Sequence, residues 1–154
     1  MAEPTPSHAA PGHHTVTPYA IVPDAREAIA FYERAFGAER VSLHVDEHDK
    51  VRHAEIRIAG SPIMLAEDFV FGGVVAKSPA AAGSSGMHVY LYVADADAAV
   101  ARAMAAGTRE VMAVMDQPYG ERSGGVQDPF GHVWWISTYV GERQPAAVAA
   151  VSRP

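Results

Sequence analysis

The sequence predicts an α+β protein built from two copies of one βαβββ module. Met87–Val93 reads Met-His-Val-Tyr-Leu-Tyr-Val, with the period-two alternation of a strand. A similar stretch, Val16–Val22, begins seventy-one residues earlier. After each stretch an aspartate, Asp24 or Asp95, precedes a helical segment that ends at a glycine. We therefore expect paired modules that share one curved mixed sheet, with the helices outside and a cup inside.

The first module is expected over residues 15–68. Asp24 is the predicted N-cap of a helix, Glu27 completes a capping box, and Gly37 ends the helix. Strands are expected before this helix and three times after it. Their predicted ranges are 16–22, 40–46, 51–58 and 61–66, around a helix over 25–36.

Hydrophobic periodicity predicts which faces of the first module are buried. Ile29, Tyr32 and Phe36 recur at helical spacing and should dock the helix on the sheet. Along the strand 51–58, the apolar positions alternate with polar ones, and the apolar set should face the helix. The opposite face then carries His53, Glu55 and Arg57, together with Ser42 and His44 of the preceding strand. These residues either line a pocket or form a solvated face with a cross-strand ion pair.

The second module is expected over residues 87–140, after a glycine-rich connection at 69–86 that serves as a linker or lid. Its helix should cover 96–106 and bury Val100, Ala103 and Met104. Its strands are predicted at 87–93, 109–115, 122–127 and 132–140. By the same parity, Trp134 should face the helix.

Composition excludes several classes of protein. The 154 residues are 49% hydrophobic and carry a net charge of −6, which argues against nucleic-acid binding. There is no cysteine, and no apolar run approaches the length of a membrane span. We therefore expect a cytoplasmic protein without membrane partners. Residues 1–14 and 141–154 are rich in alanine and proline and are predicted to be a disordered arm and tail.

The strand at 87–93 carries the clearest sign of a binding site. His88, Tyr90 and Tyr92 share one face, which is too polar for a dry core and too aromatic for an ordinary solvent face. A strand whose tyrosines only cover one side of a sheet is the alternative.

Several motifs together resemble the vicinal oxygen chelate superfamily, which includes glyoxalase I, bleomycin-resistance proteins and extradiol dioxygenases. They are the duplicated module, the run Asp24–Val41 and the segment Gln127–His132. The phrases Phe31–Ala38 and His53-Ala54-Glu55 are most similar to its PhnB-like, glyoxalase/bleomycin-resistance branch. The resemblance covers about residues 15 to 140 and implies the paired-module fold.

The resemblance also implies four positions for metal ligands, one on the first and last strand of each module. Carried over to this sequence, they are Thr17, Met64, His88 and Trp135, of which only His88 is a ligand type. We therefore expect no metal cofactor. If a divalent ion such as Zn, Ni, Fe or Mn is bound, the candidate ligands are His88, His53 and Glu55, with His44 as a further one.

The expected function is metal-independent binding of a small molecule, such as sequestration of an aromatic or cationic antibiotic. The expected lining of the cup is Tyr19, His53, Glu55, Met64, His88, Tyr90, Tyr92, Trp135, Ser137 and Tyr139. The alternative is a glyoxalase-like lyase or isomerase that uses a non-standard metal site or His88 as a general base. A third possibility is an interaction or sensor module with an unused cup. A homodimer is also expected, because exposed strand edges need covering.

Overall fold

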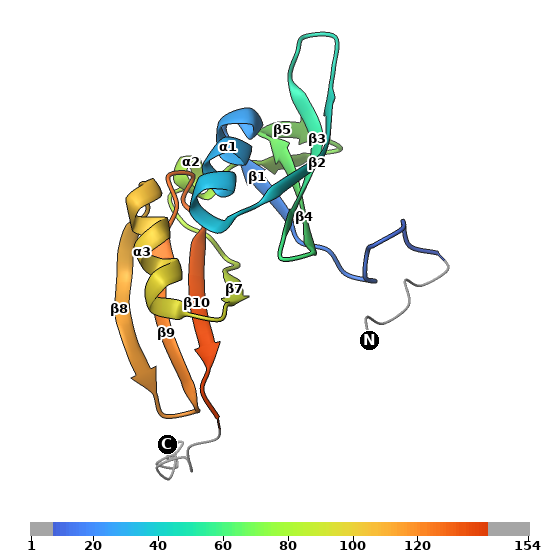
Figure 1. Cartoon of the computed structure of the whole chain (residues 1–154). Helices are drawn as coiled ribbons and strands as arrows, with labels where there is room; N and C mark the ends of the chain where they lie inside the picture. The colour runs from blue at the N-terminus through green and yellow to red at the C-terminus, as the bar shows by residue number, and fades with distance from the viewer. Residues whose placement is uncertain (1–7, 142–154) are drawn as a thin grey trace, which may run out of the picture.

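The computed structural model describes residues 8–141, which form two βαβββ modules joined by a connection with its own short elements (Figure 1). The first module comprises β1 (Tyr19–Val22), α1 (Ala25–Phe36), β2 (Glu39–Val45), β3 (Val51–Ile58) and β4 (Ser61–Glu67). The second comprises β7 (Val89–Tyr92), α3 (Ala96–Ala106), β8 (Arg109–Gln117), β9 (Glu121–Gln127) and β10 (Val133–Tyr139). The predicted fold of paired modules with mixed sheets is confirmed.

Each module has its own four-stranded sheet, in the orders β1-β4-β3-β2 and β7-β10-β9-β8. The first strand of each module pairs in parallel with the last, and the other pairs are antiparallel. Within residues 8–141 no strand pairing joins the two sheets, so the expected single curved sheet is two separate sheets in this chain.

The two helices begin and end as the repeat predicts. The carboxylates of Asp24 and Asp95 accept hydrogen bonds from the backbone N–H groups of Glu27 and Ala98, respectively. Gly37 and Gly107 follow the helices with φ of 66° and 115°, the left-handed region that favours glycine. The same capping chemistry therefore sets the length of both helices.

One hydrophobic core runs through both modules, where α1 and α3 lie side by side (Figure 1). Trp134 is buried, as expected, with its ring centroid 4.3 Å from that of Phe36 and 5.4 Å from that of Tyr32. The Tyr32 hydroxyl and the Trp134 indole N–H both donate to Oδ2 of Asp128, at 2.8 and 2.9 Å. Asp128 thus ties the helix of one module to the last strand of the other.

The expected burial of Met104 is wrong, because this side chain is 38% exposed. The buried stripe of α3 consists of Ala96, Val100 and Ala103, and Met104 lies one residue farther around the helix. Its sulfur instead accepts a hydrogen bond from Thr108 at 3.5 Å near the helix end.

The connection is more regular than predicted. It contains the hairpin of β5 (Phe69–Phe71) and β6 (Val74–Ala76), followed by the short helix α2 (Pro79–Ala82). Gly72 and Gly73 have φ of 57° and 80°, as a two-residue hairpin turn requires. Strand β7 begins at Val89, so Met87 and His88 precede it.

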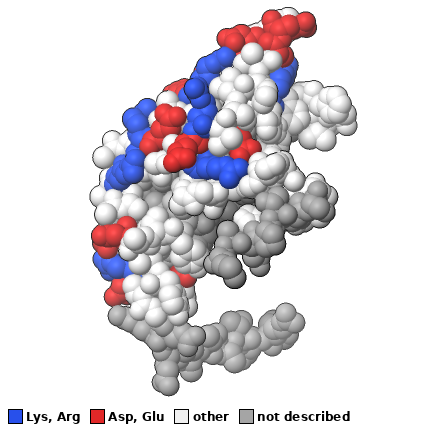
Figure 2. Space-filling model, turned by 45° about the vertical axis from the view of Figure 1, so that its right-hand side comes forward, with Lys and Arg blue, Asp and Glu red and all other residues white. Residues whose placement is uncertain are grey.

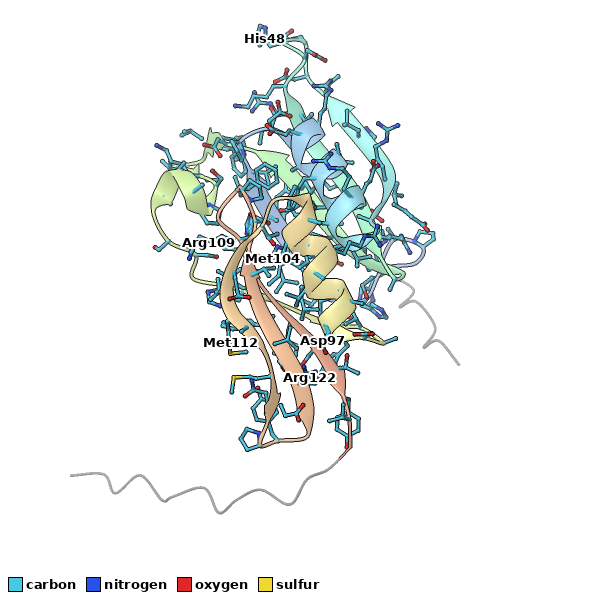
Figure 3. The ribbon with its side chains drawn as sticks, turned by 60° about the vertical axis from the view of Figure 1, so that its left-hand side comes forward. His48, Asp97, Met104, Arg109, Met112 and Arg122 are labelled. Carbon is cyan, nitrogen blue, oxygen red and sulfur yellow. The ribbon has the colours of Figure 1, made fainter. Side chains whose placement is uncertain are left out.

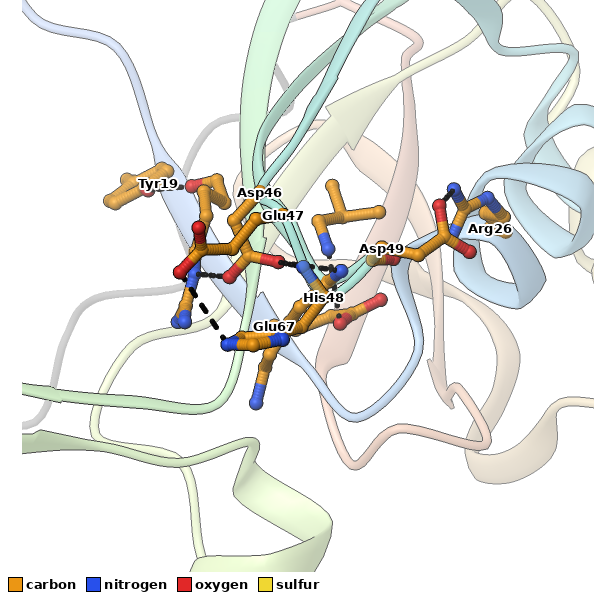
Figure 4. A network of polar contacts seen from close by, with 10 residues as sticks. Tyr19, Arg26, Asp46, Glu47, His48, Asp49 and Glu67 are labelled. Atoms are coloured by element: carbon orange, nitrogen blue, oxygen red, sulfur yellow. Dashed lines mark hydrogen bonds and ion pairs between the residues drawn. The ribbon is translucent and has the colours of Figure 1, made fainter.

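The turn between β2 and β3 is held by a network of polar contacts (Figure 4). Asp46 accepts from the backbone N–H groups of His48 and Lys50 at 2.9 and 3.0 Å and from Arg52 Nε at 2.6 Å. Hydrogen bonding to Lys50 and His48 and the contact with Arg52 outweigh burial and lower the pKa of Asp46. His48 lies at the far tip of this hairpin, away from the second module (Figure 3).

Basic and acidic side chains are interspersed over α1 and the neighbouring strands on the face drawn in Figure 2. The second module has an exposed pair on its helix side, in which Arg122 Nη2 lies 2.8 Å from Asp97 Oδ1 (Figure 3). No helix among residues 8–141 is long and apolar enough to cross a bilayer.

Candidate functional site

The sheet face of the second module that points away from α3 carries a cluster of hydroxyl groups around one carboxylate. Tyr92 donates to Glu121 Oε1 at 2.6 Å, Ser137 donates to Oε2 at 2.7 Å, and Tyr90 donates to Oε2 as well. Ser123 shares a hydrogen bond with Ser137. We call these five residues the tyrosine–carboxylate cluster.

Strand register explains why the cluster forms. Tyr92 on β7 lies opposite Ser137 on β10, which lies opposite Ser123 on β9. Because side chains alternate along each strand, Tyr90 and Glu121 reach the same face. Glu121 itself is only 8% exposed, whereas the rings of Tyr90 and Tyr92 are 46% and 60% exposed. The cluster thus places a buried carboxylate beneath two accessible aromatic rings.

The hydrogen bonds also set the charge of the cluster. Donation by Tyr90, Tyr92 and Ser137 lowers the pKa of the Glu121 carboxyl, so it is ionised near neutral pH. The bond to Glu121 raises the pKa of Tyr92 to about 12, and burial followed by the bond to Glu121 raises that of Tyr90. In the described part of the chain, none of the ion pairs involves Glu121. Among residues 8–141, the negative charge of Glu121 therefore has no cationic partner.

Trp135 extends the same face toward the other end of the strands. Its indole lies across Gly125, where an added Cβ would sit only 2.5 Å from the ring, so any other residue would displace it. Its Nε1 donates to His88 Nδ1 at 3.1 Å. Since an indole nitrogen only donates, Nδ1 of this histidine is the acceptor, and the neutral imidazole carries its proton on Nε2.

The corresponding face of the first module is chemically different. Glu55 on β3 is buried and contacts two basic groups, His13 Nε2 at 2.8 Å and Arg57 Nη2 at 3.2 Å. Gly12 packs so closely on Arg57 that a Cβ there would lie 2.8 Å from the guanidinium. Gly12 and His13 therefore lie on this face. The disordered arm expected over residues 1–14 stays a prediction, and residues 1–7 lie outside the described residues.

The predicted site residues separate into two groups. Tyr90, Tyr92 and Ser137 meet at Glu121, and His88 meets Trp135 beside them, while Tyr139 lies opposite Glu121 at the end of β10. Tyr19 and His53 lie together in the first module, with ring centroids 6.1 Å apart. Met64 lies between their strands, opposite both Tyr19 and Glu55.

Two members of the cluster, Glu121 and Ser123, were not among the predicted site residues. The strand predicted at 122–127 begins one residue after Glu121, whereas β9 begins at Glu121 itself. The alternation of Glu121, Ser123 and Gly125 is the signal that could have found them. It places Glu121 on the same sheet face as Ser123, the face that points away from α3.

A sequence profile of the glyoxalase/bleomycin resistance protein/dioxygenase superfamily matches residues 5–136. The chain belongs to this superfamily. An uncharacterized protein of Mycobacterium bovis is 38% identical over 129 residues, which is 82% of this chain and 84% of that protein. An uncharacterized protein of Mycobacterium tuberculosis is equally identical over 82% of this chain and 75% of its own length.

Solved structures of the superfamily fold agree with this assignment. The gene product of Arabidopsis thaliana AT5G48480 is 30% identical, with a TM-score of 0.63 over 79% of this chain and 96% of that one. TioX from Micromonospora sp. ML1 has a TM-score of 0.65 at 24% identity, over 80% and 97% of the two chains. FosX from Listeria monocytogenes, solved with Mn(II), has a TM-score of 0.57 at 18% identity, over 78% and 85%. The last two show likeness of fold.

The donor set of this superfamily member does not fit the metal centre that the family resemblance implies. Of the four carried-over positions, Met64 and Trp135 offer a thioether and an indole, and Thr17 offers a hydroxyl. Within residues 8–141, no three His, Asp or Glu side chains are grouped to hold a metal ion. The alternative set of His53, Glu55 and His88 is likewise not grouped within the described residues.

Proposed function

We propose that this superfamily member binds a planar aromatic cation on the tyrosine–carboxylate cluster without using a metal, as a sequestering protein does. The proposal depends on the buried, ionised Glu121, which has hydroxyl partners and, among residues 8–141, no cationic one. A ligand cation above Tyr90 and Tyr92 would gain both the attraction of this charge and cation–π contacts. Each such contact contributes about 0.5–2 kcal/mol.

Aromatic groups on both sides of the cluster support the same ligand class. Trp135 and His88 lie at one end, and the exposed ring of Tyr139 lies at the other. Stacking on such rings is favourable for a flat ring system. Sequestration of an aromatic or cationic antibiotic is our proposal within this ligand class.

General-base catalysis by His88 is disfavoured by its bond to Trp135. That bond occupies Nδ1, the nitrogen that is unprotonated in the neutral ring, and leaves Nε2–H as a donor. The low pKa of Glu121 also makes this carboxylate a weak base at neutral pH. The cluster is therefore better suited to holding a cation than to accepting a proton.

The test is titration with 9-aminoacridine, a planar aromatic cation, followed by calorimetry and by thermal shift. We expect the wild type to bind it and Glu121→Gln to weaken binding by about tenfold, the equivalent of 1.4 kcal/mol. Glu110→Gln makes the same chemical change at an exposed site on β8 and should leave binding intact. Equal binding by wild type and Glu121→Gln, or a stoichiometric requirement for added Zn, Ni, Fe or Mn, would refute the proposal.

The proposed active form is a homodimer. The β5–β6 hairpin has an apolar surface whose residues are each between 59% and 81% exposed: Val70, Phe71, Val74 and Val75. Exposed apolar surface of this kind is typical of a protein interface. Gel filtration with light scattering should give twice the mass of the 16.4 kDa chain, and a monomer at micromolar concentration would contradict it.

A further inference from the structure

A cavity of about 360 Å³ lies between the two modules, on the helix side of the sheets and apart from the tyrosine–carboxylate cluster. Its inner wall consists of buried side chains, among them Tyr32, Leu65 and Trp134. Its exposed lining residues include Lys77 and Ser84 of the connection. This volume is at the lower end of the range of ligand pockets, which begins near 300 Å³.

The inner wall offers carbon surfaces to a ligand. Tyr32 and Trp134 direct their polar atoms to Asp128, so they present carbon atoms and no unpaired polar group to the cavity. Asp128 accepts two further bonds, from the backbone N–H groups of Phe130 and His132, and its oxygens are thereby satisfied. A flat aromatic ring is the group that such a wall packs against best.

The charge around the cavity has one sign. Lys77 is the single lysine or arginine among the lining residues, and none of them is acidic. Ser84 and Ser85 add hydroxyl groups, and the histidine among the lining residues already uses Nε2 on the carbonyl oxygen of Ile21. An anion at the exposed end would meet a cation and hydroxyl donors there.

From these observations we propose that the cavity between the modules is a second binding site, which takes a small aromatic carboxylate. Its ring lies in the apolar part of the cavity, beside Ile21 and Val89, and its carboxylate lies at Lys77. The site goes beyond the proposed function, because its ligand is an anion and its residues are separate from the tyrosine–carboxylate cluster.

Calorimetric titration with 2-naphthoate and with its neutral analogue 2-naphthamide tests the charge preference. We expect 2-naphthoate to bind at least about tenfold more tightly than the amide. Lys77→Glu should abolish this preference, whereas Lys50→Glu, the same change at the β2–β3 turn, should retain it. Failure of wild type to bind 2-naphthoate, or a preference that survives Lys77→Glu, would overturn the proposal.

A second pair of variants tests the location. Val89→Phe adds a ring inside the cavity and should remove binding of 2-naphthoate, while Val111→Phe, at a 42% exposed position on β8, should keep it. Circular dichroism and thermal unfolding verify that both variants fold. Glu121→Gln should leave 2-naphthoate binding unchanged. Retained binding in Val89→Phe, or its loss in Glu121→Gln, would place the ligand elsewhere, and either result leaves the test with 9-aminoacridine unaffected.

Discussion

The two modules share one backbone plan but treat the buried carboxylate on their open faces in opposite ways. In the first module, Glu55 is paired with Arg57 and with His13 from the segment before β1. In the second, Glu121 is held by neutral hydroxyl groups. Within residues 8–141 the first carboxylate has basic partners and the second has none, and our proposal assigns a ligand cation to the second. The two carboxylates lie at different positions of the repeat. Glu55 pairs with Met64, whereas Trp135, the counterpart of Met64, pairs with Gly125, and Glu121 lies farther along β9 opposite Tyr139. The modules therefore differ both in where the carboxylate lies and in the charge of its neighbours.

The largest effect on stability is expected where the two modules meet, because one hydrophobic core contains residues of both. Asp128→Ala would leave the Tyr32 hydroxyl, the Trp134 indole N–H and two backbone N–H groups without their acceptor. Losing the partner of several buried donors should lower the free energy of unfolding by about 3–5 kcal/mol. Urea denaturation measures this loss.

Asp97→Ala is the control for that measurement, since it breaks an exposed ion pair with Arg122. Exposed pairs contribute little, so this variant should be far closer to wild type than Asp128→Ala. Equal stability of the two variants would show that the contact between the modules is not a major source of stability.

A loss of stability of intermediate size should distinguish the two buried carboxylates. Glu55→Gln removes the charge that faces His13 and Arg57, and should cost about 2 kcal/mol because two charge-assisted hydrogen bonds are weakened. In Glu121→Gln the amide oxygen can still accept from a hydroxyl, and the expected cost is about 1 kcal/mol. Chemical denaturation of the two variants shows which of them loses more stability. A larger loss of stability in Glu121→Gln would contradict the view that Glu55 has the stronger, charged partners.

Much of this fold could be predicted from the sequence, because the signals are local. Asp24 and Asp95 with their following glycines predicted both helices at their observed bounds, and period-two alternation put Trp134 on the buried side. The hairpin in the connection was missed, although Gly72-Gly73 between two apolar triplets is a known turn signal. The length and the four glycines of residues 69–86 favour a loop, and this signal masks the short turn within it.

The site was predicted only in part, because it depends on contacts between distant residues. Tyr90 and Tyr92 could be placed on one face by parity, but their acceptor Glu121 is about thirty residues away on β9. Likewise nothing in the local pattern of the first fourteen residues indicates that His13 reaches Glu55. Strand register and the path of the segment before β1 determine both contacts, and neither is visible in a single stretch of sequence.

The smallest expected effect is a change in the pKa of one exposed phenol, that of Tyr92. It tests the hydrogen bond to Glu121, which distinguishes the second module. The hydrogen bond to Glu121 raises the pKa of Tyr92 from 10.0 to about 12. Titration of the tyrosinate absorbance, with the curve of Tyr92→Phe subtracted from that of wild type, should show one phenol that ionises at about pH 12. In Glu121→Gln this difference curve should move back toward 10, and in Glu110→Gln it should stay. An unshifted phenol in wild type would mean that the hydroxyl does not donate to the carboxylate in solution.

The signs of the two pKa shifts define the pH range over which this contact stabilises the fold. The pKa of Tyr92 is raised, so the contribution is present below about pH 10 and is lost as the pH rises through about 12. The pKa of Glu121 is lowered, so the contribution is present above the ordinary pKa of a glutamate and is lost as the pH falls through the lowered value. Glu55 has no phenol partner, so Glu55→Gln should leave the alkaline limit where it is in wild type. A shift of that limit in Glu55→Gln would show that the two open faces are coupled.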